Sequence, residues 1–449
     1  MKKFLASALA TIITVLCLTP CAAAATYRPS FEPSAQGVYM VNLDSNMVIY
    51  EKNAQAPVQP GSLAQLMTVI LALEKVPNLA SKTGEMKSYM QDEMYNRRIA
   101  LGGKLRLGGL LRGDTVTLDK LLYAVMLPGA NDAALMIADT VGDGSVPYFV
   151  EMMNQRAQEL GALHTRFASP HGLPDPDATT TAYDMAIIAK HAMSLEGFDK
   201  LVSVSTYNGG PLPRIARLDW NTTNQFLRGT SEFYNPAITC VKESYIAGST
   251  LGNSMVALAK KDGYTYLVSA MGCTGADAAG NDISMTAAFY ESTRLFSWAF
   301  DTFRVKTLLE KGKSFEEIKL KLCWGKDFLR LMSADSFTAL IPDAIESSSV
   351  QYELMLPNYV EAPIEKGQLV GEVKLILADE VIGRVGVVSA EAVEASHILM
   401  LREKLLSMTR TFWFKFIVVL LLVLVIMYVG MTILRNHTRR RYGGWKRKS

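Results

Sequence analysis

The sequence is poor in the residues that most often mark metal and cofactor sites. Its 449 residues include only five histidines and five cysteines, and no two histidines have the H-E-x-x-H spacing of a zinc enzyme. We therefore expect neither a metal nor another cofactor. Cys240, Cys273 and Cys323 are the cysteines beyond residue 25. Because three thiols form at most one disulfide and unpaired cysteines are often buried, we expect unpaired thiols.

The chain also lacks the excess of positive charge that attracts nucleic acid. It has 46 Lys and Arg against 43 Asp and Glu, and nine of the basic residues lie in the first three and last fifteen positions. The part between these ends is therefore acidic, with about six net negative charges before histidines are counted. The sequence shows no internal repeat and no low-complexity linker. We expect no nucleic-acid partner.

The first thirty residues, MKKFLASALATIITVLCLTPCAAAATYRPS, have the three parts of a secretory signal. Two lysines come first, an apolar stretch over 4–18 follows, and a run of alanines ends at Ala25. We predict a signal peptide over residues 1–25 and export of the remainder. Cys21 would suggest a lipid-modified cysteine instead, but Pro20 before it fits that pattern poorly.

An uncharged stretch near the other end, residues 416–434, is long enough to cross a bilayer as a helix. Aromatic residues at 412–414 precede it, as is common where a helix meets the membrane surface. The segment 435–449 has seven Lys and Arg and no acid, and such segments stay in the cytoplasm. We expect a single-pass cell-membrane protein whose bulk is extracytoplasmic and whose basic tail is cytoplasmic.

The predicted exported part divides into two regions with different patterns of apolar residues. Residues 27–304 alternate short strands with long helices, which predicts an α+β fold. Residues 305–393 have alternating apolar residues and turn pairs, which predicts a small β domain, and 394–415 predict a juxtamembrane helix. The clearest elements are hairpins at 37–53 and 254–273 and helices at 118–127, 131–142, 146–161 and 283–300.

The stretch PGSLAQLMTVILALE, residues 60–74, leaves two roles open for Ser62. Apolar residues recur behind it at helical spacing, so a buried helix begins here. Serine is a favoured N-cap, because its oxygen accepts a hydrogen bond from a free N–H of the first turn. From this stretch alone we predict a capping role for Ser62. The alternative is a nucleophile, which would need a base near by.

Three further stretches follow in order: LLYAVMLPGANDAALMIAD, ELGALHTRFASPHGLPDPDATTTAYDMAIIAKHA and CVKESYIAGSTLGNSMVALAKKDGYTYLVSAMG. Together with the Ser62 stretch, their order and spacing resemble the D-alanyl-D-alanine carboxypeptidases, the low-molecular-weight penicillin-binding proteins. The stretch APIEKGQLVGEVKLILADEVIGRVGVVSAEAVEA resembles that family's C-terminal β domain. The resemblance implies a penicillin-binding, β-lactamase-like domain of antiparallel sheet and helical cluster over 27–304. Within the second of these three stretches, Thr181 and Asp184 are spaced as a helix capping box.

Three motifs build the site in this family: S-x-x-K at a helix start, S-x-N in a loop, and K-T-G on an edge strand. The lysine of the first motif takes the proton of the attacking serine, and the third motif binds the terminal carboxylate of the substrate. The resemblance places these positions on the following residues: Ser62 at the nucleophile, Gln65 at the lysine, Gly129 at the second serine, Asn131 at the asparagine, and Lys242, Glu243 and Ser244 at K-T-G, with Tyr245 supplying an oxyanion N–H.

Each departure from these motifs removes part of the chemistry. The amide of Gln65 is not basic, and loss of a positioned base removes about 10²–10⁴ in rate. Gly129 has no hydroxyl to relay a proton. Glu243 repels a carboxylate at about 4 Å by on the order of 1–4 kcal/mol, which an ion pair between Lys242 and Glu243 would partly offset. The side chain of Ser244 crowds the strand edge, where glycine permits a closer approach.

We therefore expect a hydrolytically silent, membrane-tethered relative that binds peptidoglycan stem peptides or partner proteins of wall synthesis or sporulation. In this interpretation Ser62 keeps the position of the nucleophile and only a capping role. The alternative is an active serine-type carboxypeptidase with an atypical base, for which Ser62, Asn131 and Lys242 are the features. A third possibility is a spacer or assembly module whose β domain and membrane helix carry the function.

Overall fold

The structure, a computed structural model, describes residues 28–212, 214–244, 252–275 and 282–442. The predicted signal peptide and Tyr245 lie outside these residues. The chain forms two compact units. The first comprises residues 1–305 with 340–344, and the second comprises 306–339 with 345–449.

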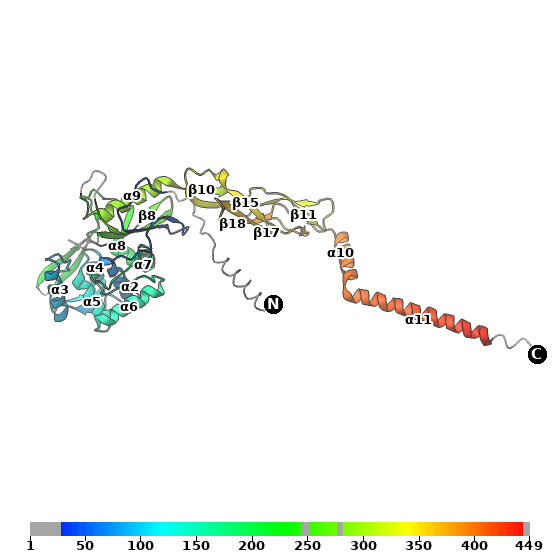
Figure 1. Cartoon of the computed structure of the whole chain (residues 1–449), viewed down its shortest axis with the longest axis horizontal. Coiled ribbons are helices and arrows are strands. Elements are labelled where there is room, and N and C mark those ends of the chain that lie inside the picture. Colours follow the sequence, from blue (N-terminus) through cyan, green and yellow to red (C-terminus); the bar gives the residue numbers. More distant parts are fainter. Residues whose placement is uncertain (1–27, 213, 245–251, 276–281, 443–449) are drawn as a thin grey trace, which may run out of the picture. The chain divides into compact units, whose positions relative to one another are not determined.

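The centre of the first unit is an antiparallel sheet with the strand order β2-β1-β9-β8-β7 (Figure 1). Both predicted hairpins are confirmed. In the second, Lys261 pairs with Tyr264 around a turn in which Asp262 and Gly263 have φ of 53° and 82°, as a tight two-residue hairpin turn requires. The strands are β1 (Gly37–Asn42), β2 (Val48–Lys52), β7 (Ile238–Ser244), β8 (Asn253–Lys261) and β9 (Tyr264–Cys273).

Helices cover both faces of this sheet, which confirms the α+β prediction (Figure 1). On one face, α9 packs on β8 and β9 and encloses one apolar core. On the other face, α7 packs on the sheet together with the remaining helices, and these enclose a second apolar core. The helices of this unit are α2 (Ala64–Lys75), α3 (Ser88–Ala100), α4 (Leu118–Met126), α5 (Asn131–Val141), α6 (Val146–Glu159), α7 (Ala182–Ser194), α8 (Phe198–Ser203) and α9 (Ala287–Thr302).

Short elements connect the larger ones. The pairs β3 (Thr83–Glu85) with β4 (Thr115–Thr117) and β5 (Thr206–Leu212) with β6 (Ile215–Asn221) form two small hairpin sheets. Two 3-10 turns, η1 (Gly61–Leu63) and η2 (Gln225–Leu227), precede α2 and β7. α2 is buried along most of its length, which explains the continuous apolar run behind Ser62 in the sequence.

The predicted capping role of Ser62 is wrong. Ser62 lies inside η1, α2 begins two residues later, and neither helix has a side-chain cap. A 3-10 turn before the α-helix uses the first free N–H groups itself, since Leu63 N–H donates to Pro60 O. Of the two hydrogen bonds of the predicted capping box at Thr181 and Asp184, one is present. Thr181 accepts a hydrogen bond from Asp184 N–H at 3.0 Å, whereas the Asp184 carboxylate accepts from His164 and Thr165 instead of reaching back.

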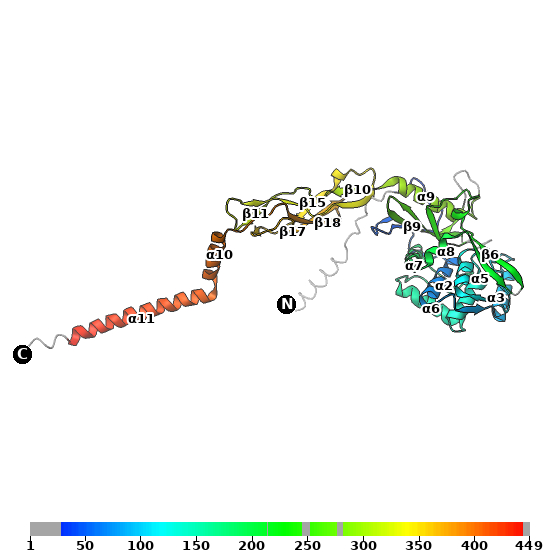
Figure 2. The same ribbon diagram turned by 180° about the vertical axis from the view of Figure 1, so that it is seen from behind.

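The second unit contains the predicted β domain (Figure 2). A four-stranded sheet has the order β13-β18-β17-β15, and a three-stranded sheet has the order β12-β11-β16. The strands are β10 (Phe303–Leu309), β11 (Ile318–Lys321), β12 (Phe328–Leu329), β13 (Leu331–Ser333), β14 (Phe337–Pro342), β15 (Gln351–Met355), β16 (Val360–Glu361), β17 (Leu369–Leu377) and β18 (Glu380–Ser389), with the turn η3 (Ser347–Ser349).

Two helices follow the β domain: α10 (His397–Arg410) and α11 (Phe412–Tyr442). Ser396 caps α10, and Thr411 stands between the two helices. Within α11, residues Phe412–Arg435 are long and apolar enough to cross a membrane, with a mean hydropathy of 3.0 in their most apolar window and none of that window buried.

Candidate active site

Six of the eight predicted site residues come together from four elements of the first unit, and each is almost fully buried. η1 and α2 supply Ser62 and Gln65, the N-terminus of α5 supplies Asn131, and β7 supplies the rest. Gly129 lies in the turn just before α5, with its carbonyl on Gln65. The position of Tyr245 is outside the described residues.

The side-chain amide nitrogen of Gln65 is a hydrogen-bond donor that is surrounded by oxygen acceptors. Its Nε2 lies 3.1 Å from Gly129 O, 3.3 Å from Asn131 Oδ1 and 3.3 Å from His171 O. Three oxygen acceptors around one atom require the amide nitrogen, not the amide oxygen, to face them. The nitrogen lone pair of an amide is delocalised, so this group donates hydrogen bonds as a lysine would but cannot accept a proton. Gln65 Oε1 is buried without a hydrogen-bond partner in the described part of the chain.

The N-terminus of α5 makes hydrogen bonds to the backbone of the loop that contains Arg106. Asn131 Nδ2 donates to Arg106 O at 2.8 Å, and Asn131 N–H donates to the same oxygen. Asp132 accepts hydrogen bonds from the backbone N–H groups of Gly108 and Leu110. Although burial raises the pKa of the Asp132 carboxyl, these backbone donors act against that rise. The pair Asn131–Asp132 therefore fixes the backbone at Arg106 and with it the direction of the Arg106 side chain.

Gly129 adopts a left-handed backbone, with φ of +74°. A Cβ atom built there would lie 3.3 Å from Arg106 Nη1 and 3.7 Å from Lys242 Nζ. The space that a second serine would use is thus bordered by two cationic groups. A glycine is favoured here because other residues adopt this conformation only with strain.

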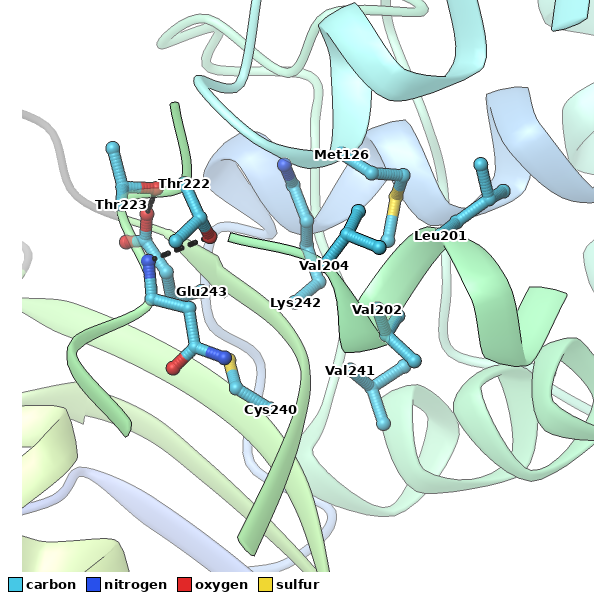
Figure 3. A pocket seen from close by; sticks show the side chains of 11 residues that line it. Met126, Leu201, Val202, Val204, Thr222, Thr223, Cys240, Val241, Lys242 and Glu243 are labelled. Carbon is cyan, nitrogen blue, oxygen red and sulfur yellow. Dashed lines mark hydrogen bonds between the residues drawn. The ribbon is translucent and has the colours of Figure 1, made fainter. Parts of the chain in front are cut away.

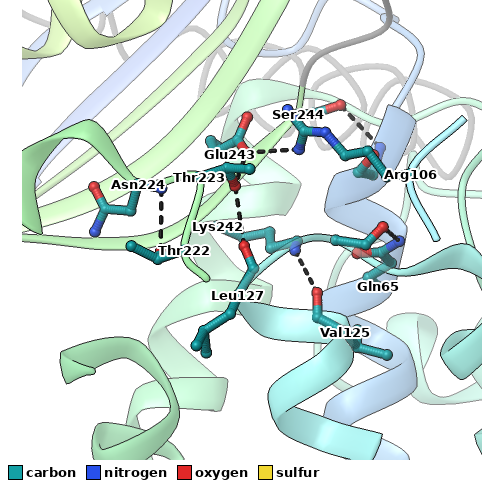
Figure 4. A network of polar contacts seen from close by, with 12 residues as sticks. Gln65, Arg106, Val125, Leu127, Thr222, Thr223, Asn224, Lys242, Glu243 and Ser244 are labelled. Carbon is teal, nitrogen blue, oxygen red and sulfur yellow. Dashed lines mark hydrogen bonds and ion pairs between the residues drawn. The ribbon is translucent and has the colours of Figure 1, made fainter. Parts of the chain in front are cut away.

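Lys242 extends from β7 toward α4, where its Nζ donates to Val125 O at 2.7 Å (Figure 4). Burial is the main cause that lowers the pKa of Lys242 to about 8. Figure 3 shows the adjoining pocket, lined by Met126, Cys240 and Lys242 among others, with a volume of about 20 Å³. A space of that size holds on the order of one water molecule and no peptide terminus.

Glu243 pairs with Arg106 and not with Lys242, which corrects the expected ion pair. Glu243 Oε1 lies 2.7 Å from Arg106 Nη1 and accepts from Thr223 Oγ1 at 2.6 Å. Lys242 and Glu243 leave the strand in different directions, since neighbouring strand residues face opposite sides (Figure 3). Burial alone would raise the pKa of Glu243. The Arg106 charge, the Thr223 hydroxyl and the Lys242 charge outweigh it, so this pKa lies below its usual value.

The side-chain hydroxyl of Ser244 accepts a hydrogen bond from a backbone N–H of the site. Ser62 N–H donates to Ser244 Oγ at 2.8 Å, across 182 positions of the chain. In serine hydrolases the N–H of the nucleophile is one of the donors that bind the developing oxyanion, at 2.7–3.1 Å. Ser244 Oγ therefore occupies an acceptor position on this N–H.

Two residues of this network, Arg106 and Thr223, were missed by sequence reasoning. Neither belongs to a motif, and each meets Glu243 only through the fold. The available signal was the Glu243 substitution itself, because a carboxylate buried beside a strand needs a cation or donors. In the described residues no group of three or more His, Cys, Asp and Glu side chains is arranged to hold a metal ion, and all three cysteines are free thiols.

The model of the D-alanyl-D-alanine carboxypeptidase family matches residues 23–274, which is more than half of the chain. This chain belongs to that family. A second model, the C-terminal domain of penicillin-binding protein 5, matches residues 303–395. The family resemblance inferred from the motifs is thus confirmed, and members of this family act on peptidoglycan.

Individual relatives match different lengths of the chain. The D-alanyl-D-alanine carboxypeptidase DacF of Bacillus subtilis strain 168 is 25% identical over 384 residues, covering 85% of this chain and 90% of that protein. A D-alanyl-D-alanine carboxypeptidase of Streptomyces sp. strain K15 is 31% identical over 220 residues, covering 46% of this chain and 72% of that protein.

Solved structures agree with the fold. The structure of penicillin binding protein 5 from Haemophilus influenzae superposes with a TM-score of 0.56 at 23% identity, covering 82% of this chain and 99% of that one. Penicillin binding protein 6B from Escherichia coli gives a TM-score of 0.58 at 20% identity, with coverage of 81% and 97%. The chain has the penicillin-binding, β-lactamase-like α+β fold followed by a C-terminal β domain.

Proposed function

We propose that this protein is a membrane-anchored, extracytoplasmic, hydrolytically silent member of its family. It binds wall peptides or proteins of wall synthesis rather than cleaving D-alanyl-D-alanine. The observation that carries this proposal is the pair of substitutions around Ser62. An amide stands where the family has a lysine base, and a serine hydroxyl is bonded to the N–H of Ser62.

The first substitution removes the proton acceptor. Attack by a serine hydroxyl on a peptide carbonyl needs a base within hydrogen-bond reach, and the Nε2 of Gln65 is occupied as a donor to three oxygens. Gly129 supplies no relay hydroxyl. Loss of a positioned base alone slows such reactions by about 10²–10⁴.

The second set of substitutions fills the space that a substrate would use. Ser244 Oγ takes the N–H of Ser62, and the Arg106–Glu243 ion pair stands at the family's carboxylate-binding position. A substrate would have to break both contacts and would bring its own carboxylate to a buried glutamate. Removal of one oxyanion donor typically reduces turnover by a further factor of about 10²–10³.

The membrane attachment is part of the proposal. The helix over Phe412–Arg435 has the length and composition of a membrane span, and Phe412 and Trp413 at its start suit the membrane interface. The basic residues after it favour a cytoplasmic C-terminus, with both folded units on the opposite side.

Labelling with a fluorescent penicillin tests the silent character. The full chain is incubated beside an active family member, and Ser62→Ala serves as the matched control. We expect no stoichiometric adduct on either form of this protein. A stoichiometric label that disappears in Ser62→Ala would show that acyl transfer survives and would overturn the proposal.

A second candidate, an active carboxypeptidase with an atypical base, is favoured by one observation. The lowered pKa of Lys242, about 8, makes a neutral amine accessible near neutral pH. This candidate predicts D-alanine release from a pentapeptide that rises with pH through about 8. Release at a normal family rate that is abolished in Lys242→Met would establish it, and its absence leaves the first proposal in place.

A further inference from the structure

The three-stranded sheet of the second unit has one strongly buried and one exposed face. Along β11, Ile318 and Leu320 are buried while Lys319 and Lys321 are exposed. Phe328 of β12 lies directly opposite Lys319, so it shares the exposed face. The exposed face of this small sheet therefore presents a phenylalanine among lysines.

Two further aromatic residues extend this exposed face. Lys321 Nζ lies 3.2 Å from the centroid of the Tyr359 ring, which places Tyr359 on the same side. Trp324, in the turn between β11 and β12, is 75% exposed, and Phe328 is 48% exposed. A tryptophan this exposed has no packing role in its own domain. We call Lys319, Lys321, Trp324, Phe328 and Tyr359 the tip surface.

The tip surface lies beside the start of α10. Ser396 N–H, at the N-cap of α10, donates to Leu322 O at 2.7 Å. α10 has 14 residues, so at 1.5 Å per residue it spans about 21 Å whatever its direction. Because only Thr411 separates α10 from α11, the backbone at Leu322, next to the turn that carries Trp324, lies within about that distance of the start of the proposed membrane span.

The composition of α10 indicates that the separation is smaller than this maximum. Ile398, Leu401, Leu405 and Met408 recur at helical spacing and are all exposed. A helix with such an apolar stripe next to a membrane span lies in the plane of the interface, since only lipid can cover the stripe there. With α10 lying flat, Leu322 and the turn that carries Trp324 are brought to the level of the headgroups.

Acidic residues next to the tip surface offset its two lysines. Glu361 pairs with Lys321 in the register of β16 and β11, and Asp327 directly precedes Phe328. Lysine and amphipathic aromatic side chains together are the composition of membrane–water interfaces, where rings sit at headgroup level. Aromatic contact with lipid, rather than net charge, would therefore supply most of the attraction.

We infer that the tip surface docks on the outer face of the lipid bilayer that α11 crosses, with Trp324 and Phe328 among the headgroups. This inference rests on the membrane anchoring in the proposed function. With the tip surface docked, the β domain is attached to the membrane at two places, through α11 and through the tip surface. Its orientation is then more restricted than it would be with α11 alone.

Cys323 provides a probe next to Trp324, because Cys240 and Cys273 are buried and Cys323 is accessible. The chain without the predicted signal peptide, which contains Cys17 and Cys21, carries a nitroxide on Cys323 and is reconstituted in vesicles of phosphatidylcholine and phosphatidylglycerol. Relaxation is measured with oxygen, which partitions into lipid, and with a water-soluble nickel complex. The matched control, Cys323→Ser with Ser348→Cys, places the label on the exposed turn η3 of the same domain.

We expect oxygen to dominate at position 323 and the nickel complex to dominate at position 348. In Trp324→Ser with Phe328→Ser, we expect the label at 323 to become as water-accessible as the control, with unchanged flotation on vesicles. High salt should change little. Flotation with a water-accessible label at 323 in the unmodified tip would overturn the docking surface and leave the anchor intact. Failure to float would overturn the anchoring, and the docking surface with it.

Discussion

The candidate site has two walls, a helical wall formed by η1, α2 and α5 and a strand wall formed by β7. The two walls depart from the family pattern in different ways. On the helical wall, Gln65 replaces the base but keeps a donor directed at Asn131 and two backbone carbonyls. On the strand wall, Glu243 and Ser244 bring new side chains that bind Arg106 and the N–H of Ser62. In the proposed function, the helical wall lacks the base of the family but keeps its packing, and the side chains of the strand wall occupy the position of the substrate.

From this difference we expect that restoring a base would not by itself restore activity. A lysine at position 65 would face a Ser62 whose N–H remains bonded to Ser244, beside a carboxylate that repels the substrate. The two walls therefore need to be tested together and then separately.

The largest effect is expected from reversing both walls at once with Gln65→Lys, Gly129→Ser, Glu243→Thr and Ser244→Gly. We expect covalent penicillin labelling of Ser62 to rise by at least about 10², the lower range for regaining a positioned base. Glu243→Thr releases Arg106, which gives the introduced hydroxyl at position 129 room. Labelling kinetics with a fluorescent penicillin measure the gain.

Two controls sharpen this experiment. Adding Ser62→Ala should abolish the label, and Gln65→Lys alone should give little of the gain because the strand wall is unchanged. A fourfold variant that folds cooperatively yet stays unlabelled would show that the assignment of the motif positions is wrong.

The next largest effect concerns the strand wall. Arg106→Met leaves the Glu243 carboxylate, whose side chain is 9% exposed, without its cation. We expect a loss of about 2–3 kcal/mol in the free energy of unfolding, below the ~3–5 kcal/mol of fully buried pairs because Arg106 is partly exposed. The pKa of Glu243 is lowered in the folded protein. Its stabilising contribution is thus present at neutral pH and lost as pH falls through that pKa.

Urea unfolding measures this loss, and we expect it to shrink in acid. Arg106→Met combined with Glu243→Gln should recover most of the loss, since no charge is then left unpaired. Arg112→Met, at an exposed arginine of the same loop, should change stability by less than about 0.5 kcal/mol. Equal losses in Arg106→Met and Arg112→Met would contradict the pairing.

Lys242 gives an effect in the alkaline range, whereas that of Glu243 lies in the acid range, and in both ranges stability rises with pH because folding lowers the pKa of each group. Its pKa falls from 10.5 to about 8 on folding, so the unfolded chain binds more protons between these values and stability rises with pH across that window. At about 1.4 kcal/mol per pKa unit, the rise is up to about 3 kcal/mol in the unchanged protein. Lys242→Met removes the titrating group, and it separately loses roughly 1 kcal/mol for the hydrogen bond to Val125 O. Unfolding at several pH values should show that Lys242→Met lacks this rise. A parallel pH profile in both forms would argue against a perturbed lysine.

The smallest effect separates a cap from a former nucleophile. Thr181 caps α7, so Thr181→Ala should cost about 1 kcal/mol. Ser62 makes no capping bond, so Ser62→Ala should change stability by less than about 0.5 kcal/mol. Thermal unfolding of the two variants makes the comparison. A larger loss in Ser62→Ala than in Thr181→Ala would return the capping role to Ser62.

Periodicity and turn chemistry predicted most of the larger elements correctly. The hairpin around Asp262 and Gly263 follows from a dipeptide that favours left-handed backbone, and α5 follows from its apolar spacing. The start of α2 was predicted wrongly, because a serine before an apolar run reads as a cap whether or not a 3-10 turn intervenes. The β5–β6 hairpin and α3 were not predicted, since their residues are largely polar and weakly periodic.

What the sequence by itself determined is the chemistry that is missing. The family assignment, and the proposal that Gln65, Gly129 and Glu243 lack the chemistry of the family, follow from ordered motifs, because a functional group is either present in a side chain or absent. Only the tertiary structure decided what fills the space. Arg106 and Glu243 are 137 positions apart, and Ser62 and Ser244 are 182 apart. A partner for a buried charge or N–H is chosen by proximity in the folded chain, and no local pattern encodes that proximity.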